Sequence, residues 1–177
     1  MRMLAVAVVV ASVLASGCSS DQAFTVGSQH LVVKDQIYQS KATYFCNGLA
    51  ADQVKFRFVD YGPACAVDRN GAPDPFDATK EHTELDIVIS FTGNPMWPTK
   101  AFDASGDCDA GGANAAVTFL HVPANANGVA DTTMKATVGS IKLGTYDPTG
   151  AKPTTGNFDV TIGGSQVKGS INSYSCN

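Results

Sequence analysis

The chain has 177 residues, of which 44% are hydrophobic, and this is enough for one domain with its own core. Its formal net charge of −4 and the absence of any run of Lys or Arg disfavour nucleic acid and anionic lipid headgroups as partners. Seventeen glycines and few long helix-favouring stretches favour strands joined by turns.

The chain opens with an export signal. Arg2 supplies a positive start, residues 4–14 are an almost unbroken apolar run, and small residues follow at 15–17. The run is too short to cross a bilayer, which takes about 20 apolar residues. The pattern predicts a helical, cleaved signal peptide over residues 1–17.

Cys18 follows the stretch LASG, and this arrangement resembles the lipobox of bacterial lipoproteins. The resemblance implies diacylation of the Cys18 thiol, cleavage before Cys18 and N-acylation. In that family an Asp after the cysteine favours inner-membrane retention, so Ser19 implies the outer membrane. Residues 18–23 would be a lipidated tether, and two or three acyl chains would hold it on a membrane. Ordinary secretory cleavage is the alternative, because Ala15 stands where the family usually has Leu.

Period-two alternation of apolar residues predicts a series of strands after the tether. The pattern changes parity at Gly139-Ser140, which marks a bulge or a tight turn. One helical turn is expected over residues 77–84. The expected strands cover residues 31–33, 36–45, 54–59, 85–91, 117–122 and 138–146.

The clearest element is a hairpin at residues 155–175. Phe158, Val160 and Ile162 alternate with polar residues, and Gly163-Gly164 is a two-residue turn signal. This turn sets Phe158 opposite Gly169, so that the ring covers the bare glycine backbone. Together, seven or eight short strands predict an all-β domain at residues 24–177. It is expected to be an antiparallel β-sandwich or a partly open barrel, of which we favour the sandwich.

The C-terminal part also resembles a known group. The segments VGSIKL at 138–143 and GNFDVT at 156–161, followed by Gly169-Ser170 and Cys176, look like the tail of small lipoproteins abundant in gliding soil bacteria. The match covers about a quarter of the chain, and its residues are common in any β-hairpin. The resemblance supports export to the membrane and a β-rich architecture, and it implies no activity.

Four cysteines remain once Cys18 is set aside, an even number in an exported chain. This favours two disulfides, whose pairing the sequence does not choose. A zinc site is the weaker alternative, because no C-x-x-C pair occurs. The four residues are Cys46, Cys65, Cys108 and Cys176.

Oxygen-bearing side chains alternate at residues 103–109, a pattern that can supply calcium ligands. An EF-hand is excluded because Cys108 stands where that loop needs Gly. We expect a solvated acidic loop, with a weak calcium site as the alternative. Its candidate ligands are Asp103, Ser105, Asp107 and Asp109.

No catalytic signature stands out. Ser165 and Lys168 spell S-x-x-K, but the companion motifs of penicillin-recognising enzymes are missing and the two side chains would point to opposite faces. His30, His82 and His121 are far apart, and we expect unrelated surface or edge histidines rather than a metal site. We therefore expect a protein that is not an enzyme and takes no cofactor.

Met96 and Trp97, between two prolines, form the candidate recognition loop. An exposed Trp97 could stack on a sugar or anchor a protein partner, whereas an inward Trp97 would cap the core. The sequence thus predicts a surface lipoprotein that serves as a binding or structural module for a protein, glycan or cell-wall partner. A small extracytoplasmic hydrolase or metal-dependent enzyme, and a calcium-stabilised adhesin, are the alternatives.

Overall fold

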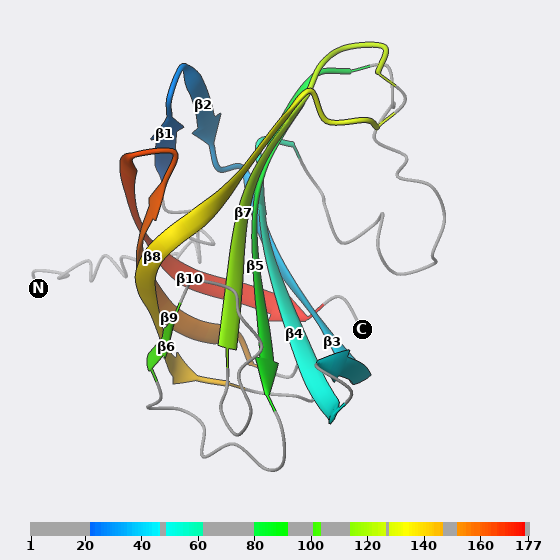
Figure 1. The fold of residues 1–177 in the computed structure, drawn as a ribbon, viewed down its shortest axis with the longest axis vertical. Coiled ribbons are helices and arrows are strands. Elements are labelled where there is room, and N and C mark those ends of the chain that lie inside the picture. Colours follow the sequence, from blue (N-terminus) through cyan, green and yellow to red (C-terminus); the bar gives the residue numbers. More distant parts are fainter. Residues whose placement is uncertain are drawn as a thin grey trace, which may run out of the picture.

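The computed structural model describes residues 22–46, 49–61, 80–91, 101–103, 114–126, 128–146 and 152–175. The described residues contain ten strands and no helix, which confirms the predicted all-β class (Figure 1). The strands are β1 (Ala23–Val26), β2 (Gln29–Val32), β3 (Asp35–Cys46), β4 (Leu49–Val59), β5 (His82–Phe91), β6 (Ala101–Asp103), β7 (Asn114–Val122), β8 (Thr132–Thr145), β9 (Thr154–Ile162) and β10 (Ser165–Ser175).

Eight of these strands form one strongly curled sheet, in the order β6-β8-β7-β5-β4-β3-β10-β9. Strand β9 also pairs with β8, so the pairing runs around the curl and returns to its start. All pairs are antiparallel except a short parallel contact between β10 and β3. The sheet therefore takes the form of a partly open barrel, one of the two predicted architectures.

The opening of this barrel lies between β10 and β3. In the described residues these strands pair only at Tyr174 with Ile37 and Ser175 with Tyr38. The β1–β2 hairpin is a separate two-stranded sheet whose first strand packs beside β10 (Figure 1). Phe24 of this hairpin is buried and packs edge-on against Phe58 and Phe158, with ring centroids 6.0 and 5.6 Å apart.

The register of the β9–β10 hairpin is as predicted. Gly163 and Gly164 have φ of +55° and +81°, a conformation that suits glycine in a two-residue turn. Phe158 lies opposite Gly169, and a Cβ on Gly169 would lie 2.5 Å from the Phe158 ring. The aromatic ring therefore occupies the space that a side chain at residue 169 would need.

Three details differ from the sequence analysis. Residues 82–84 belong to β5, so the expected helical turn is wrong there; residues 77–79 lie outside the described part. Strand β8 continues through Gly139-Ser140, and its register shifts between Ala136 and Val138, so a bulge or irregularity is present and the tight turn is wrong. Strands β1 and β6 were not predicted, because four and three residues are too few to show a period.

Candidate functional site

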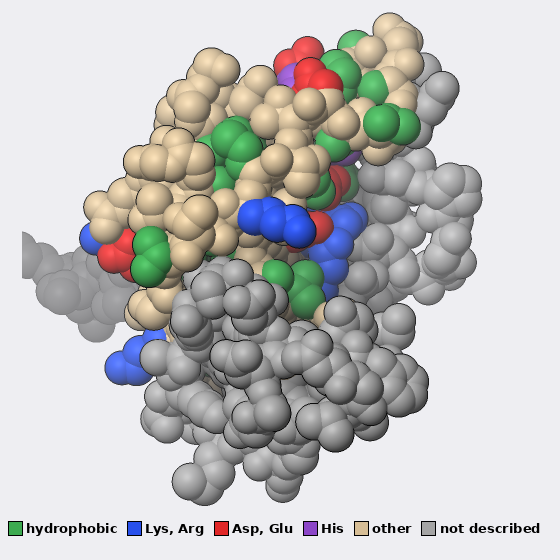
Figure 2. Space-filling model, in the orientation of Figure 1, with side chains coloured by type: hydrophobic (Ala, Val, Ile, Leu, Met, Phe, Trp, Pro, Cys, Tyr) green, Lys and Arg blue, Asp and Glu red, His purple; other side chains and the backbone are tan. Residues whose placement is uncertain are grey.

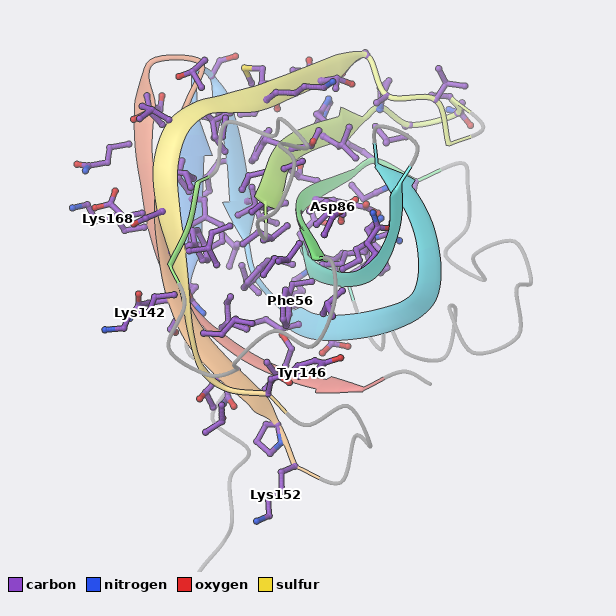
Figure 3. The ribbon with its side chains drawn as sticks, turned by 60° about the horizontal axis from the view of Figure 1, so that its bottom comes forward. Phe56, Asp86, Lys142, Tyr146, Lys152 and Lys168 are labelled. Carbon is purple, nitrogen blue, oxygen red and sulfur yellow. The ribbon has the colours of Figure 1, made fainter. Side chains whose placement is uncertain are left out.

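The two faces of strands β4 and β5 differ in chemistry. Phe56 pairs with Ile87, and both face the core without exposure to solvent. The next residues, Arg57 and Asp86, pair with each other on the opposite face, because neighbouring residues of a strand alternate between faces. Figure 3 labels one residue of each face, Phe56 and Asp86. The charged face is the main candidate site that the described residues offer.

Asp86 is the centre of this face. Its carboxylate lies 2.7 Å from Lys55 Nζ and 3.1 Å from Arg57 Nε. Arg57 Nε also lies 3.4 Å from Glu84, and the side chains of Glu84 and Asp86 are only 8% and 9% exposed. Burial alone would lower the pKa of Arg57, but the two carboxylates outweigh it and raise this pKa. Two cations are thus matched by two anions.

Glu84 extends this group toward the start of β5. It accepts a hydrogen bond of 3.0 Å from the Tyr61 hydroxyl and lies 3.5 Å from His82 Nε2. Burial would raise the pKa of Glu84, yet His82 and Arg57 lower it; burial would lower the pKa of His82, yet Glu84 raises it. We call Lys55, Arg57, His82, Glu84 and Asp86 the β4–β5 charge cluster.

A second group lies on the other face, at the same end of β5. His121 is opposite Thr83 in the register, and its side chain is 9% exposed. Its Nδ1 lies 2.8 Å from Asp131 and its Nε2 lies 3.1 Å from Glu81. Burial would lower the pKa of His121, but these two carboxylates raise it. We call these three residues the His121 clip.

The clip is built to hold a proton and leaves no ring nitrogen for a reacting group. A neutral imidazole has one N–H, so it would turn a lone pair toward one of the carboxylates, whereas an imidazolium donates to both. The pair of His121 and Asp131 resembles the orienting pair of a hydrolytic triad, but Glu81 stands where a nucleophile would be needed. This geometry fits a structural ion pair.

The structure places two of the histidines differently from the expectation of unrelated surface or edge residues. His82 was expected at the surface or at an edge, but it begins β5 and is buried, as is His121. His30 is exposed on β2 and faces the Thr25 hydroxyl at 3.0 Å. No group of three or more His, Cys, Asp or Glu that could hold a metal occurs among the residues that the structure describes.

The S-x-x-K residues take up separate structural roles. The Ser165 hydroxyl accepts a hydrogen bond of 3.3 Å from the Gly27 N–H, at the tip of the β1–β2 hairpin. Lys168 lies 2.8 Å from Asp159 in an exposed ion pair. The two side chains engage different partners, as expected of a chance motif.

Most of the predicted site residues lie outside the described part, and the hypotheses built on them stay predictions. Cys46 ends β3 and Asp103 ends β6, but only the backbone of these two residues is described. The residues outside are Cys18, Cys65, Met96, Trp97, Ser105, Asp107, Cys108, Asp109 and Cys176.

The β4–β5 charge cluster was missed at the sequence level, although a signal was present. Lys55 and Arg57 alternate with the apolar residues of one predicted strand, and Glu84 and Asp86 precede and alternate with those of the next. Opposite charges at alternate positions of adjacent strands favour cross-strand pairing. Figure 2 shows charged side chains of both signs close together on the described surface, with hydrophobic ones in small separate groups.

Comparison of the chain with protein-family models, with curated proteins and with solved structures finds no match in any of the three. Within the described residues, the structure contains no helix of the length and apolarity that a bilayer span needs.

Proposed function

We propose that this protein is a lipoprotein anchored in the outer membrane through Cys18. We further propose that its β domain is a binding or structural module for a protein, glycan or cell-wall partner, and not an enzyme. The observation that carries the proposal is Cys18 itself, placed directly after an apolar run and three small residues. Acyl chains on this cysteine supply the anchor.

The position of the folded domain supports the anchor. Strand β1 begins at Ala23, five residues after Cys18. The residues between them that precede the described part are Ser19, Ser20 and Asp21, which are small and polar. A short polar connection suits a domain held at a membrane surface.

The contacts of the buried charged groups support a scaffold role. Asp86 is shared by Lys55 and Arg57, and both ring nitrogens of His121 engage carboxylates. Such pairs compensate the cost of burying charge and fix the positions of strands. A rigid curled sheet of this kind can present loops to a partner, and Met96 and Trp97 are our candidates for such contacts.

Replacement of the anchor residue tests the proposal. We expect Cys18→Ala to move the protein from the membrane fraction to a soluble or unprocessed pool and to abolish labelling by a fatty-acid analogue. Ser19→Ala is the matched control and should change neither. Unchanged fractionation of the Cys18 variant, with no acyl label on the wild type, would contradict the anchor.

Binding to cell-wall material tests the proposed role of the β domain as a binding module. Wild-type protein should co-sediment with purified sacculi or with a surface polysaccharide, and Trp97→Ala should weaken this if the loop supplies the contact. Tyr146→Ala, a change at a half-buried aromatic residue, controls for loss of an aromatic ring elsewhere.

A further inference from the structure

The start of the described chain is fixed on strand β10. Gln22 Oε1 accepts a hydrogen bond of 2.7 Å from the Ser170 N–H, and Gln22 Nε2 donates one of 2.9 Å to the Ser170 carbonyl. Two residues later, Phe24 is 3% exposed and packs on Phe158. The chain therefore enters the domain at one defined place, at the edge of β10.

The distance from this place to the anchor is limited by covalent geometry. Cys18 precedes Gln22 by four residues, which span about 14 Å when fully extended. Acyl chains on Cys18 would keep the lipid surface within about this distance of Gln22, whatever path the tether takes. The surface around Gln22, which includes Ser170, would then lie close to the membrane.

The strands around Ser170 bring two lysines to this surface. Ser170 pairs with Asn157, which pairs with Lys142; Lys168 is two residues before Ser170. Neighbouring strands are about 4.8 Å apart, so the Cα atoms of Lys142 and Ser170 are separated by about 10 Å. Figure 3 shows Lys142 and Lys168 extending away from the sheet on the same side of the molecule.

The charge of this face differs from that of the whole chain. The chain carries −4, yet the described charged side chains on the outer face of β8, β9 and β10 are three lysines and one aspartate. They are Lys135, Lys142, Lys168 and Asp159. Each net positive charge near an anionic lipid surface favours binding by about fivefold, so this face, where three lysines and one aspartate leave +2, is attracted while the acidic remainder is repelled.

We infer that the outer face of β8, β9 and β10 lies against anionic lipid headgroups, with Lys142 and Lys168 as its contact residues. This inference rests on the proposed acylation of Cys18, and it assigns the orientation of the anchored domain. The opposite part of the sheet, which carries the β4–β5 charge cluster, then faces away from the membrane. The lack of any run of Lys or Arg had disfavoured anionic lipid headgroups as partners. Lys142 and Lys168 are 26 positions apart in the sequence, and only strand pairing brings them to one face.

Lysine reactivity on vesicles tests the inference with the native protein. Acylated full-length protein is reconstituted into phosphatidylethanolamine vesicles containing phosphatidylglycerol, treated with a membrane-impermeant amine reagent, and compared with protein in neutral detergent by peptide mass spectrometry. We expect Lys142 and Lys168 to react more slowly on vesicles, while exposed Lys80, before β5, reacts equally in both.

A charge-reversed variant provides the matched control. The double variant Lys142→Glu, Lys168→Glu should remain in the vesicle fraction through its acyl chains but lose the orientation, so that the new amine of an added Asn157→Lys substitution becomes reactive. The same probe should stay protected in a Lys80→Glu variant. Acylated, vesicle-bound wild type whose Lys142 and Lys168 react as fast as in detergent would overturn the orientation alone; a chain without acyl groups would overturn the anchor as well.

Discussion

Phe158 and Gly169 lie directly opposite each other on β9 and β10, and the aromatic ring fills the space above the glycine. A Cβ at residue 169 would lie 2.5 Å from Phe158 Cζ and 2.6 Å from Gln22 Oε1. The same ring packs against Phe24 and Phe58, with centroids 5.6 and 5.4 Å away. Because Gly169 has no side chain, the Phe158 ring and Gln22 of the N-terminal segment can both lie close to β10.

The first prediction concerns this glycine. Gly169→Ala should lower the free energy of unfolding by about 1–3 kcal/mol, because the added methyl group overpacks the aromatic cluster. Urea unfolding of the wild type and the variant measures the change. Ser170→Ala, an exposed neighbour whose backbone keeps its bonds, should change stability by less than about 0.5 kcal/mol. If Phe158→Leu fails to relieve the cost of Gly169→Ala, the overpacking argument is wrong.

Gln22 supplies a second prediction. Gln22→Ala removes both bonds to the Ser170 backbone and should cost about 1–2 kcal/mol, since each hydrogen bond contributes about 1 kcal/mol. Hydrogen exchange should show faster exchange of the Ser170 amide in the variant. Gln166→Ala, which removes only an exposed bond to Asp159, is the control and should leave that amide unchanged. Equal protection of the Ser170 amide in all three proteins would contradict a stabilising role for the two Gln22 hydrogen bonds.

The charge cluster gives a third prediction. Asp86→Asn leaves Lys55 and Arg57 without their shared carboxylate in a partly buried setting and should destabilise the protein by about 2 kcal/mol or more. Asp159→Asn is the matched change at an exposed ion pair, and it should have no measurable effect. Thermal and urea unfolding of both variants compare the two sites. Similar losses from both would mean that burial does not decide the strength of these pairs.

The His121 clip predicts a pH dependence. The folded pKa of His121 is raised above its ordinary 6.5, so the clip contributes fully below pH 6.5 and loses its contribution as the pH rises through the folded pKa. The pKa of Asp131 is lowered by the bond to His121, so this carboxylate stays charged in that range. His121→Gln should therefore lower Tm by about 2–4 °C at pH 5.5, and much less at pH 9.

His30→Gln is the control for this experiment, because His30 is exposed and faces a hydroxyl. A constant difference between wild type and His121→Gln across the pH range would show that packing, and not charge, is what the histidine contributes. NMR titration of the imidazole gives the folded pKa directly.

The sequence was sufficient for elements whose information is local. The β9–β10 hairpin has its turn, alternation and glycine in one continuous stretch, and its register could be predicted residue by residue. Strands β4 and β5 were also predicted from alternation, although each begins three or more residues earlier than expected. These elements fold as their own patterns demand.

Features that depend on pairing between distant strands could not be predicted. The two hydrogen bonds of Gln22 to Ser170 join residues 148 apart, and the His121 clip joins a residue just before β5, one near the end of β7 and one just before β8. No spacing rule connects such residues before the strand order is known. The proposed lipobox is the opposite case, since its pattern is entirely in the sequence and lies outside the described residues.

The mass of the N-terminal peptide of the mature protein, isolated from membranes, tests the account most directly. We predict a peptide that begins at Cys18 and carries the added mass of a diacylglyceryl group, with a further acyl chain on its amino group. A mature protein that begins at any other residue, or whose Cys18 bears no lipid, would contradict both the anchor and the orientation derived from it.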